Sequence, residues 1–234
     1  MKEYYILLTV RFVAAVALAV ILGSGSVVAF NHMPAAWFRD DGKLPEDIDQ
    51  RQRITSSPWK FVFTGVFGVC GLYMAVRDTL QYELAVIFVL FIVLEMAISD
   101  WKYMVVPDQL SFLLAVSAVG FTGMNKQWWD PLAGAAAGGA LGLGILLLGH
   151  LIYKKDAIGG ADIKFLGAMG MVTGPQGILW VFVLTTLVTA VHGLWLVAFR
   201  KVSLKEHKPM MPYAFVGSAI YLVILWDILE EFPI

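Results

Sequence analysis

Long apolar runs separated by short polar segments make up most of the chain. A helix needs about 20 apolar residues to cross the roughly 30 Å hydrocarbon core of a bilayer. The pattern therefore predicts an all-α, polytopic integral membrane helix bundle with about eight transmembrane helices, one of which (163–173) is short for a straight crossing. The predicted runs cover residues 4–30, 59–76, 82–99, 108–123, 131–152, 163–173, 177–199 and 213–230.

The basic residues between these runs predict an orientation. Thirteen of the 17 Lys and Arg residues fall on one side of the predicted bundle, three fall on the other, and Arg11 lies within the first run. Cytoplasmic loops carry the excess of Lys and Arg. We therefore expect a multi-pass protein of the plasma (inner) membrane with both termini outside the cytoplasm. The first run is too long for a signal-peptide core and is expected to be a retained span.

Composition agrees with a membrane protein that has little soluble mass. The chain of 234 residues is 59% hydrophobic and 15% charged, with a mean hydropathy of +0.74, whereas soluble domains carry about 25% charged residues. The net charge of -1 gives no indication of a nucleic-acid partner, and none is expected. The single cysteine, Cys70, rules out a disulfide framework and a CxxC zinc site, and the histidine spacing predicts no metal site.

Three glycines recur every fourth residue in the fifth run, at Gly134, Gly138 and Gly142. Small residues at this spacing lie on one helix face and allow a neighbouring helix to approach closely. Helix packing is the favoured interpretation. A groove for a substrate helix is the alternative on the same reasoning.

Two acidic residues stand at the ends of apolar runs. Asp100 ends the third run and Asp162 opens the sixth. Two crossings separate them, so the chain returns to the same face and both carboxylates are expected near the cytoplasmic boundary. Two close carboxylates share a proton, so that one can deprotonate water while the other donates a proton. This is the chemistry of aspartic peptide hydrolysis, which needs neither a metal nor a nucleophilic serine.

The turn before Asp162 contains Gly159 and Gly160. Glycines permit backbone angles that are closed to other residues and let another chain pass close by. From these residues alone, an ordinary inter-helix turn with Asp162 as helix N-cap is an equally good interpretation. Asp108, which follows Pro107, is expected to be the N-cap of the next helix.

At this point the sequence resembles a known family, the type IV prepilin peptidases, which are membrane aspartic proteases with a GxGD-type motif. The stretch from Ser99 to Asp108 resembles the first-aspartate motif, and Gly159-Gly160-Ala161-Asp162-Ile163-Lys164 resembles the second. The stretch from Lys208 to Phe215 resembles the entry to the last helix, and Gly23 to Pro34 is more loosely similar to the N-terminal block.

The resemblance implies that Asp100 and Asp162 form the catalytic dyad, with Gly159, Gly160, Ala161 and Lys164 as motif and substrate-loop residues. It implies a division into an N-terminal membrane region (1–98) and an aspartic peptidase membrane core (99–234). The chain departs from the family at Ala161, where a glycine is usual, and at Val27, where an asparagine is usual. The cytoplasmic loop (about 31–58) also lacks the zinc-binding cysteines of many bacterial members.

The expected function is cleavage of the basic leader of type IV prepilins or pseudopilins at the cytoplasmic face. The acidic residues of the loop are one candidate for recognising a basic leader, and a solvated loop face is the simpler explanation. Proteolysis needs no cofactor, whereas the family's second activity, methylation of the new pilin N-terminus, would use S-adenosylmethionine. The alternatives are a preflagellin-type or other intramembrane aspartic protease and a proton-coupled transporter. The acidic loop residues considered for recognition of a basic leader are Asp40, Asp41, Glu46, Asp47 and Asp49.

Overall fold

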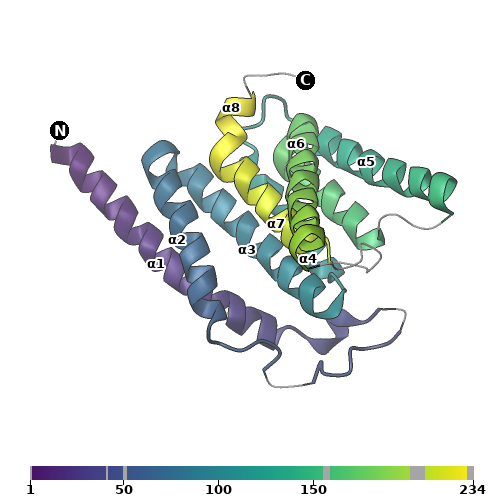
Figure 1. Cartoon of the computed structure of the whole chain (residues 1–234). Helices are drawn as coiled ribbons and strands as arrows, with labels where there is room; N and C mark the ends of the chain where they lie inside the picture. The colour runs from purple at the N-terminus through teal and green to yellow at the C-terminus, as the bar shows by residue number, and fades with distance from the viewer. Residues whose placement is uncertain (1, 41, 50–51, 155–158, 201–208, 231–234) are drawn as a thin grey trace.

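The computed structural model describes residues 2–40, 42–49, 52–154, 159–200 and 209–230. Within these ranges the chain is built of helices without a β-strand, as predicted (Figure 1). The elements in chain order are α1 (Lys2–His32), η1 (Ala35–Phe38), α2 (Trp59–Arg77), α3 (Leu80–Tyr103), α4 (Asp108–Ser117), η2 (Ala118–Phe121), α5 (Asp130–Tyr153), α6 (Gly160–Arg200), α7 (Met211–Ala219), η3 (Ile220–Leu225, π-helical) and α8 (Trp226–Glu230).

Six helices among the described residues are long and apolar enough to cross a membrane, and a shorter apolar helix covers Asp108–Phe121. One of the six, α6, consists of two helical parts joined at Gly174, which has a non-helical φ of 71° and ψ of 177°. Pro175 follows it and cannot continue a backbone hydrogen-bond ladder. The two predicted runs 163–173 and 177–199 are these two parts, so the predicted count of about eight apolar segments agrees with the fold.

The two parts of α6 run in opposite directions, as their neighbours show. Ile163 lies beside Gly142, while Gly177, just past the turn, lies beside the hydroxyl of Tyr221 at the start of η3, which follows α7. Farther along α6, His192 shares a hydrogen bond of 2.8 Å with Tyr213 at the start of α7. The first part of α6 therefore runs away from the end of the bundle where α7 begins. The second part returns toward that end.

The glycine stripe of α5 packs against the first part of α6. A Cβ added at Gly134 would lie 1.9 Å from the carbonyl oxygen of Gly170, and one at Gly138 would lie 2.1 Å from that of Leu166. Backbones this close leave no room for a side chain. Helix packing, the favoured interpretation of the stripe, is confirmed.

Helix α3 is the central helix of the bundle, and most of its residues from Val86 to Asp100 are buried. α7 and α4 pack against it, whereas α1 and α2 form a separate hairpin whose closest packing is with each other (Figure 1). The predicted boundary between 1–98 and 99–234 falls inside α3. The division into two regions stays a prediction.

The loop between α1 and α2 is folded against the end of the bundle. The Asn31 amide donates to the Ile54 carbonyl at 3.0 Å, and its oxygen accepts the Ile54 N–H at 2.9 Å. Arg53 donates to the carbonyls of Ile48 (3.0 Å) and Phe30 (3.1 Å). Buried backbone carbonyls need such partners, and here a buried guanidinium supplies them.

Candidate active site

Asp100 lies in the last turn of α3 and is 8% exposed. Its Oδ2 accepts a hydrogen bond of 2.8 Å from the backbone N–H of Met211, the first residue of α7. The first N–H groups of a helix have no partner within the helix and are free to bind an acceptor. The start of α7 thus fixes the orientation of the Asp100 carboxylate.

The turn after Asp100 has an unusual backbone. Met104 ends α3 in the left-handed region, with φ at 55° and ψ at 28°, which is uncommon for a residue other than glycine. The hydroxyl of Ser99, which is fully buried, donates to the carbonyl of Val105 and ties this turn back to the helix. Helix α3 thus ends three residues after Asp100, at Tyr103, and the chain turns from there into α4.

Asp108 does not cap α4 as predicted. Pro107 occupies the N-cap position, and Asp108 is the first residue of the helix with no side-chain capping hydrogen bond. Its Oδ1 instead lies 2.6 Å from Nζ of Lys164. The sequence signal of an acid after proline placed the helix start correctly but could not reveal a partner 56 residues away.

Asp162 is the third residue of α6 and is half-buried. Its Oδ2 accepts the backbone N–H of Gly159 at 3.1 Å, while its own N–H donates to the Gly159 carbonyl at 3.2 Å. The side chain thus reaches back to the residue that precedes the helix, as the third residue of a capping box does. The expected link between Asp162 and the helix start exists, although from inside the helix rather than from the N-cap position.

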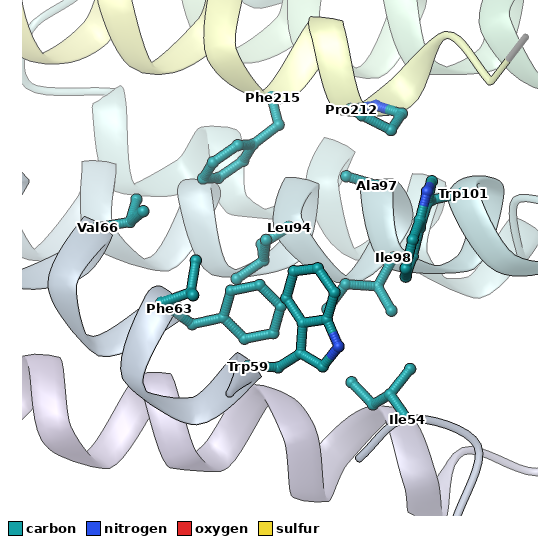
Figure 2. Close-up of a pocket in the computed structure, with 11 residues that line it drawn as sticks. Ile54, Trp59, Phe63, Val66, Leu94, Ala97, Ile98, Trp101, Pro212 and Phe215 are labelled. Atoms are coloured by element: carbon teal, nitrogen blue, oxygen red, sulfur yellow. The ribbon is translucent and has the colours of Figure 1, made fainter. Parts of the chain in front are cut away.

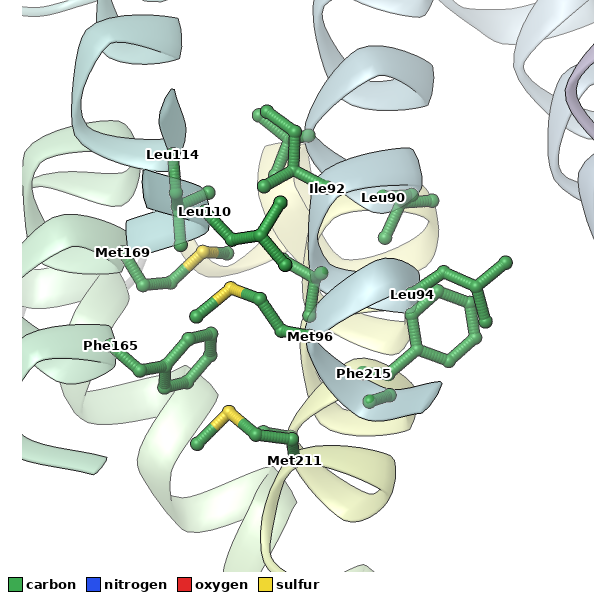
Figure 3. Close-up of a cluster of buried hydrophobic side chains, with 14 of the residues drawn as sticks. Leu90, Ile92, Leu94, Met96, Leu110, Leu114, Phe165, Met169, Met211 and Phe215 are labelled. Carbon is green, nitrogen blue, oxygen red and sulfur yellow. The ribbon is translucent and has the colours of Figure 1, made fainter. Parts of the chain in front are cut away.

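Asp100 and Asp162 lie at the same end of the bundle. Phe165, one turn after Asp162, and Met96, one turn before Asp100, are both fully buried in the central apolar cluster. In Figure 3 their side chains point toward one another and toward Met211, whose N–H binds Asp100. The buried cluster therefore connects the two helix ends that carry the carboxylates.

The second-aspartate turn lines a polar cavity of about 500 Å³. Gly159, Gly160, Ala161 and Lys164 all face it. A Cβ added at Gly160 would meet no atom within 4 Å, so the backbone borders open space there. The other walls come from the turn after α3, the start of α4 and the loop after α1, and include Val105, Val106, Asp108, Gln109, Trp37, Arg39 and Asp40. The Asp100 and Asp162 side chains are not among the lining residues.

The acidic loop residues are not gathered in one place. Asp40 lines the polar cavity, whereas Asp47 forms an ion pair with Lys102 at 3.0 Å. Glu46 and Asp49 are exposed, and Asp41 lies outside the described residues. Of the described members, only Asp40 is positioned to meet a ligand in the cavity.

The N-terminal block gives no basis for assigning cofactor ligands. Ser26, Val27 and Phe30 lie on the part of α1 that packs into the bundle and are between 0% and 4% exposed. Side chains packed in this way do not face an open cavity that could hold a methyl donor such as S-adenosylmethionine. Within the described ranges, no group of three or more His, Cys, Asp or Glu residues could hold a metal ion.

Comparison with known proteins gives a consistent result. Residues 84–194, which include Asp100 and Asp162, match the family model of the type IV leader peptidase family. The chain is 27% identical over 145 residues to a prepilin leader peptidase/N-methyltransferase of Aeromonas salmonicida, covering 61% of this chain and 49% of that protein. It is 32% identical over 133 residues to one of Xanthomonas campestris, covering 54% of this chain and 44% of that protein.

The chain spans about half the length of these curated relatives. No solved structure matches it. The matched segment contains both aspartate motifs, on a multi-pass helix bundle of the predicted class. The chain is therefore similar to the type IV leader peptidase family over the segment that carries both aspartate motifs.

Proposed function

We propose that this protein is a membrane aspartic endopeptidase that removes the leader of type IV prepilins or pseudopilins. The observation that carries the proposal is the position of Asp100 and Asp162 at one end of the bundle, joined by the packing of Met96, Phe165 and Met211. The match of residues 84–194 to the type IV leader peptidase family and the names of the curated relatives support the substrate class.

In the proposed reaction, one carboxylate takes a proton from a water molecule, whose oxygen attacks the scissile carbonyl carbon. The other carboxyl group, protonated at that moment, donates to the carbonyl oxygen and stabilises the tetrahedral intermediate. The C–N bond then breaks, and the leaving nitrogen receives a proton from the dyad. The pair would titrate as one unit, so the pH–rate profile reports the dyad rather than either residue.

The polar cavity beside the second-aspartate turn would receive the segment next to the scissile bond. Gly159 and Gly160 border it without side chains, so an extended peptide could pass close to the backbone. Asp40 and Asp108 place two carboxylates on its wall, while Arg39 and Lys164 place two cations there. This mixed lining would suit a polar segment better than an apolar one.

We also propose that this end of the bundle faces the cytoplasm of a plasma (inner) membrane, with both termini outside. The support is the concentration of Lys and Arg at this end. Methylation of the new N-terminus is a second candidate activity, since the relatives carry N-methyltransferase in their names. S-adenosylmethionine would be its methyl donor, and assay of methyl transfer to cleaved pilin tests it separately.

The deciding experiment is prepilin cleavage by purified protein in liposomes, comparing wild type with Asp100→Asn and Asp162→Asn. Each change keeps the side-chain shape and removes the titratable proton. Both variants should be folded and lose about a hundredfold to ten-thousandfold in rate, since general acid–base catalysis contributes about 10²–10⁴-fold per group. Asp227→Asn, an exposed acid near the other end, is the matched control and should retain activity.

The outcomes separate the alternatives. Cleavage by Asp162→Asn at the wild-type rate would leave the turn without a catalytic role and favour proton-coupled transport, which also uses acidic residues within the membrane. If the wild type fails on prepilin but cuts preflagellin in a dyad-dependent way, the protease assignment stands and the substrate class is wrong.

A further inference from the structure

A second cavity, different in character, lies between α2, α3 and α7 (Figure 2). Its volume is about 290 Å³, and its walls are almost entirely apolar. Trp59 and Phe63 of α2 point toward Leu94 and Ile98 of α3, with Phe215 of α7 above them (Figure 2). We call this space the apolar groove. It separates the α1–α2 hairpin from the central helices.

Two tryptophans border the groove where the helices end. The rings of Trp59 and Trp101 make an edge contact, with centroids 5.3 Å apart. Trp59 begins α2 and Trp101 lies in the last turn of α3, so both stand at the boundary between the apolar helices and the polar loop. Indole rings favour the headgroup level of a bilayer. The groove therefore extends from the headgroup level toward the membrane interior.

A cationic cavity adjoins the groove at this boundary. It has a volume of about 380 Å³ and shares Ile54, Trp59 and Trp101 with the apolar groove. Its remaining walls include Arg53 and Lys102. One continuous space thus has an apolar part at membrane depth and two cations at the headgroup level.

The cations of this cavity, Arg53 and Lys102, have different partners. Arg53 is about nine-tenths buried and donates to the carbonyls of Ile48 and Phe30, with no carboxylate of the described residues as an ion-pair partner. Lys102 pairs with Asp47 at 3.0 Å. Among the described ion pairs, Asp47 is the acid that contacts this pair of cations, and it does so through Lys102. A buried guanidinium bound to neutral carbonyls keeps its charge uncompensated and attracts an anion.

We propose that this space binds one anionic phospholipid from the bilayer, with an acyl chain in the apolar groove and the phosphate beside Arg53 and Lys102. An acyl chain is thin and flexible, and the bilayer supplies it at high local concentration. Anionic headgroups are attracted by about 1 kcal/mol per nearby cation.

The bound lipid would touch both segments that orient Asp100. Ala97, about one turn before Asp100, and Trp101, the residue directly after it, line the groove from α3. Pro212 lines it from α7, directly after Met211, whose N–H binds the carboxylate. An acyl chain packed here would support the contact between α3 and α7 from the side that faces α2. The binding proposal stands independently of the proposed peptidase activity.

The test is a count of retained lipids. Purified protein in dodecyl maltoside is incubated with an equimolar mixture of palmitoyl-oleoyl phosphatidylglycerol and phosphatidylcholine, passed over a sizing column and analysed by native mass spectrometry. Wild type should retain one lipid, predominantly phosphatidylglycerol. Val62→Trp places a bulky side chain at the half-exposed mouth of the groove and should abolish retention of both lipids. Val69→Trp, on the same helix but outside the groove lining, should retain the lipid.

The headgroup part has its own variants. Lys102→Gln and Arg53→Gln should each lower the ratio of phosphatidylglycerol to phosphatidylcholine about fivefold, as expected for one cation near a phosphate. Lys126→Gln, beside a different cavity that α8 also lines, should leave the ratio unchanged. If Arg53→Gln does not fold, Lys102→Gln decides. Retention of the lipid by Val62→Trp would overturn the groove assignment, and an unchanged ratio in the folded cation variants would overturn the anionic selectivity.

Discussion

Nζ of Lys164 lies 2.6 Å from Oδ1 of Asp108, and this ion pair joins the second turn of α6 to the first residue of α4. The two residues come from the two aspartate motifs, and both line the polar cavity. The pair therefore links the turn that carries Asp162 to the segment that follows Asp100. Its side chains are 54% and 69% exposed, so solvent screens the attraction.

Lys164→Gln should slow prepilin cleavage modestly and leave the unfolding temperature nearly unchanged. Exposed pairs contribute about 0.2–1 kcal/mol, which corresponds to roughly a 1.4- to fivefold change in rate. The charge-swapped double variant Asp108→Lys/Lys164→Asp should recover more activity than either single variant. A swap no better than the worse single variant would show that Lys164 acts on the substrate directly.

Much of the architecture could be predicted from the sequence because membrane helices are specified by long local patterns. The apolar runs located the helical segments, and the gap between residues 173 and 177 marked the reversal at Gly174. The even number of crossings between Asp100 and Asp162 placed both at one end of the bundle. Each of these inferences needs only the order of apolar and polar residues, and none needs a side-chain contact.

The contacts that shape the candidate site could not be predicted. Asp100 binds a backbone N–H of Met211, and a backbone donor leaves no signature in the residue type. Asp108 carried the signature of an N-cap but pairs with Lys164, since a distant cation competes with the local backbone. The loop between α1 and α2 lacks zinc cysteines, and its folding through Asn31 and Arg53 depends on partners 23 residues away.

The glycines of α5 offer a matched pair of variants. Gly138 and Gly139 are neighbours, yet a Cβ at Gly138 would lie 2.1 Å from the Leu166 carbonyl oxygen, while one at Gly139 would meet no atom within 4 Å. Gly138→Ala should force α5 away from α6 and cost about 1–3 kcal/mol, as overpacking does. Gly139→Ala should be neutral or stabilising by up to about 1 kcal/mol, since alanine is the better helix former.

Thermal unfolding in detergent measures both glycine variants, and cleavage assays add a second readout. Because the first part of α6 carries Asp162, Gly138→Ala should also reduce activity more than Gly139→Ala. Equal unfolding temperatures for the two variants would mean that the helices are farther apart in solution than the backbone contact indicates.

Asp78 provides a pH-dependent prediction at the other end of the molecule, in the short turn between α2 and α3. Burial raises the pKa of its carboxyl group above the usual value, and the nearby Asp227 and Glu83 raise it further, while Arg77 and Arg11 act in the opposite direction. A carboxyl group whose pKa is higher in the folded state binds its proton more tightly there than in the unfolded chain. Its favourable contribution to stability is therefore present at low pH and lost as the pH rises through the folded-state pKa.

Asp78→Asn should accordingly raise the unfolding temperature at pH 7, and the difference from wild type should shrink as the pH falls toward about 4, the usual pKa of an aspartate. Asp227→Asn should raise it in the same direction by a smaller amount, because it removes one of the three causes that raise the Asp78 pKa. The double variant should gain less than the sum of the two, since the charges act on each other. Asp49→Asn, an exposed acid of the loop, serves as the control. An Asp78→Asn effect of the same size at pH 4.5 and pH 7 would show that the stabilisation comes from the amide itself rather than from the removed charge.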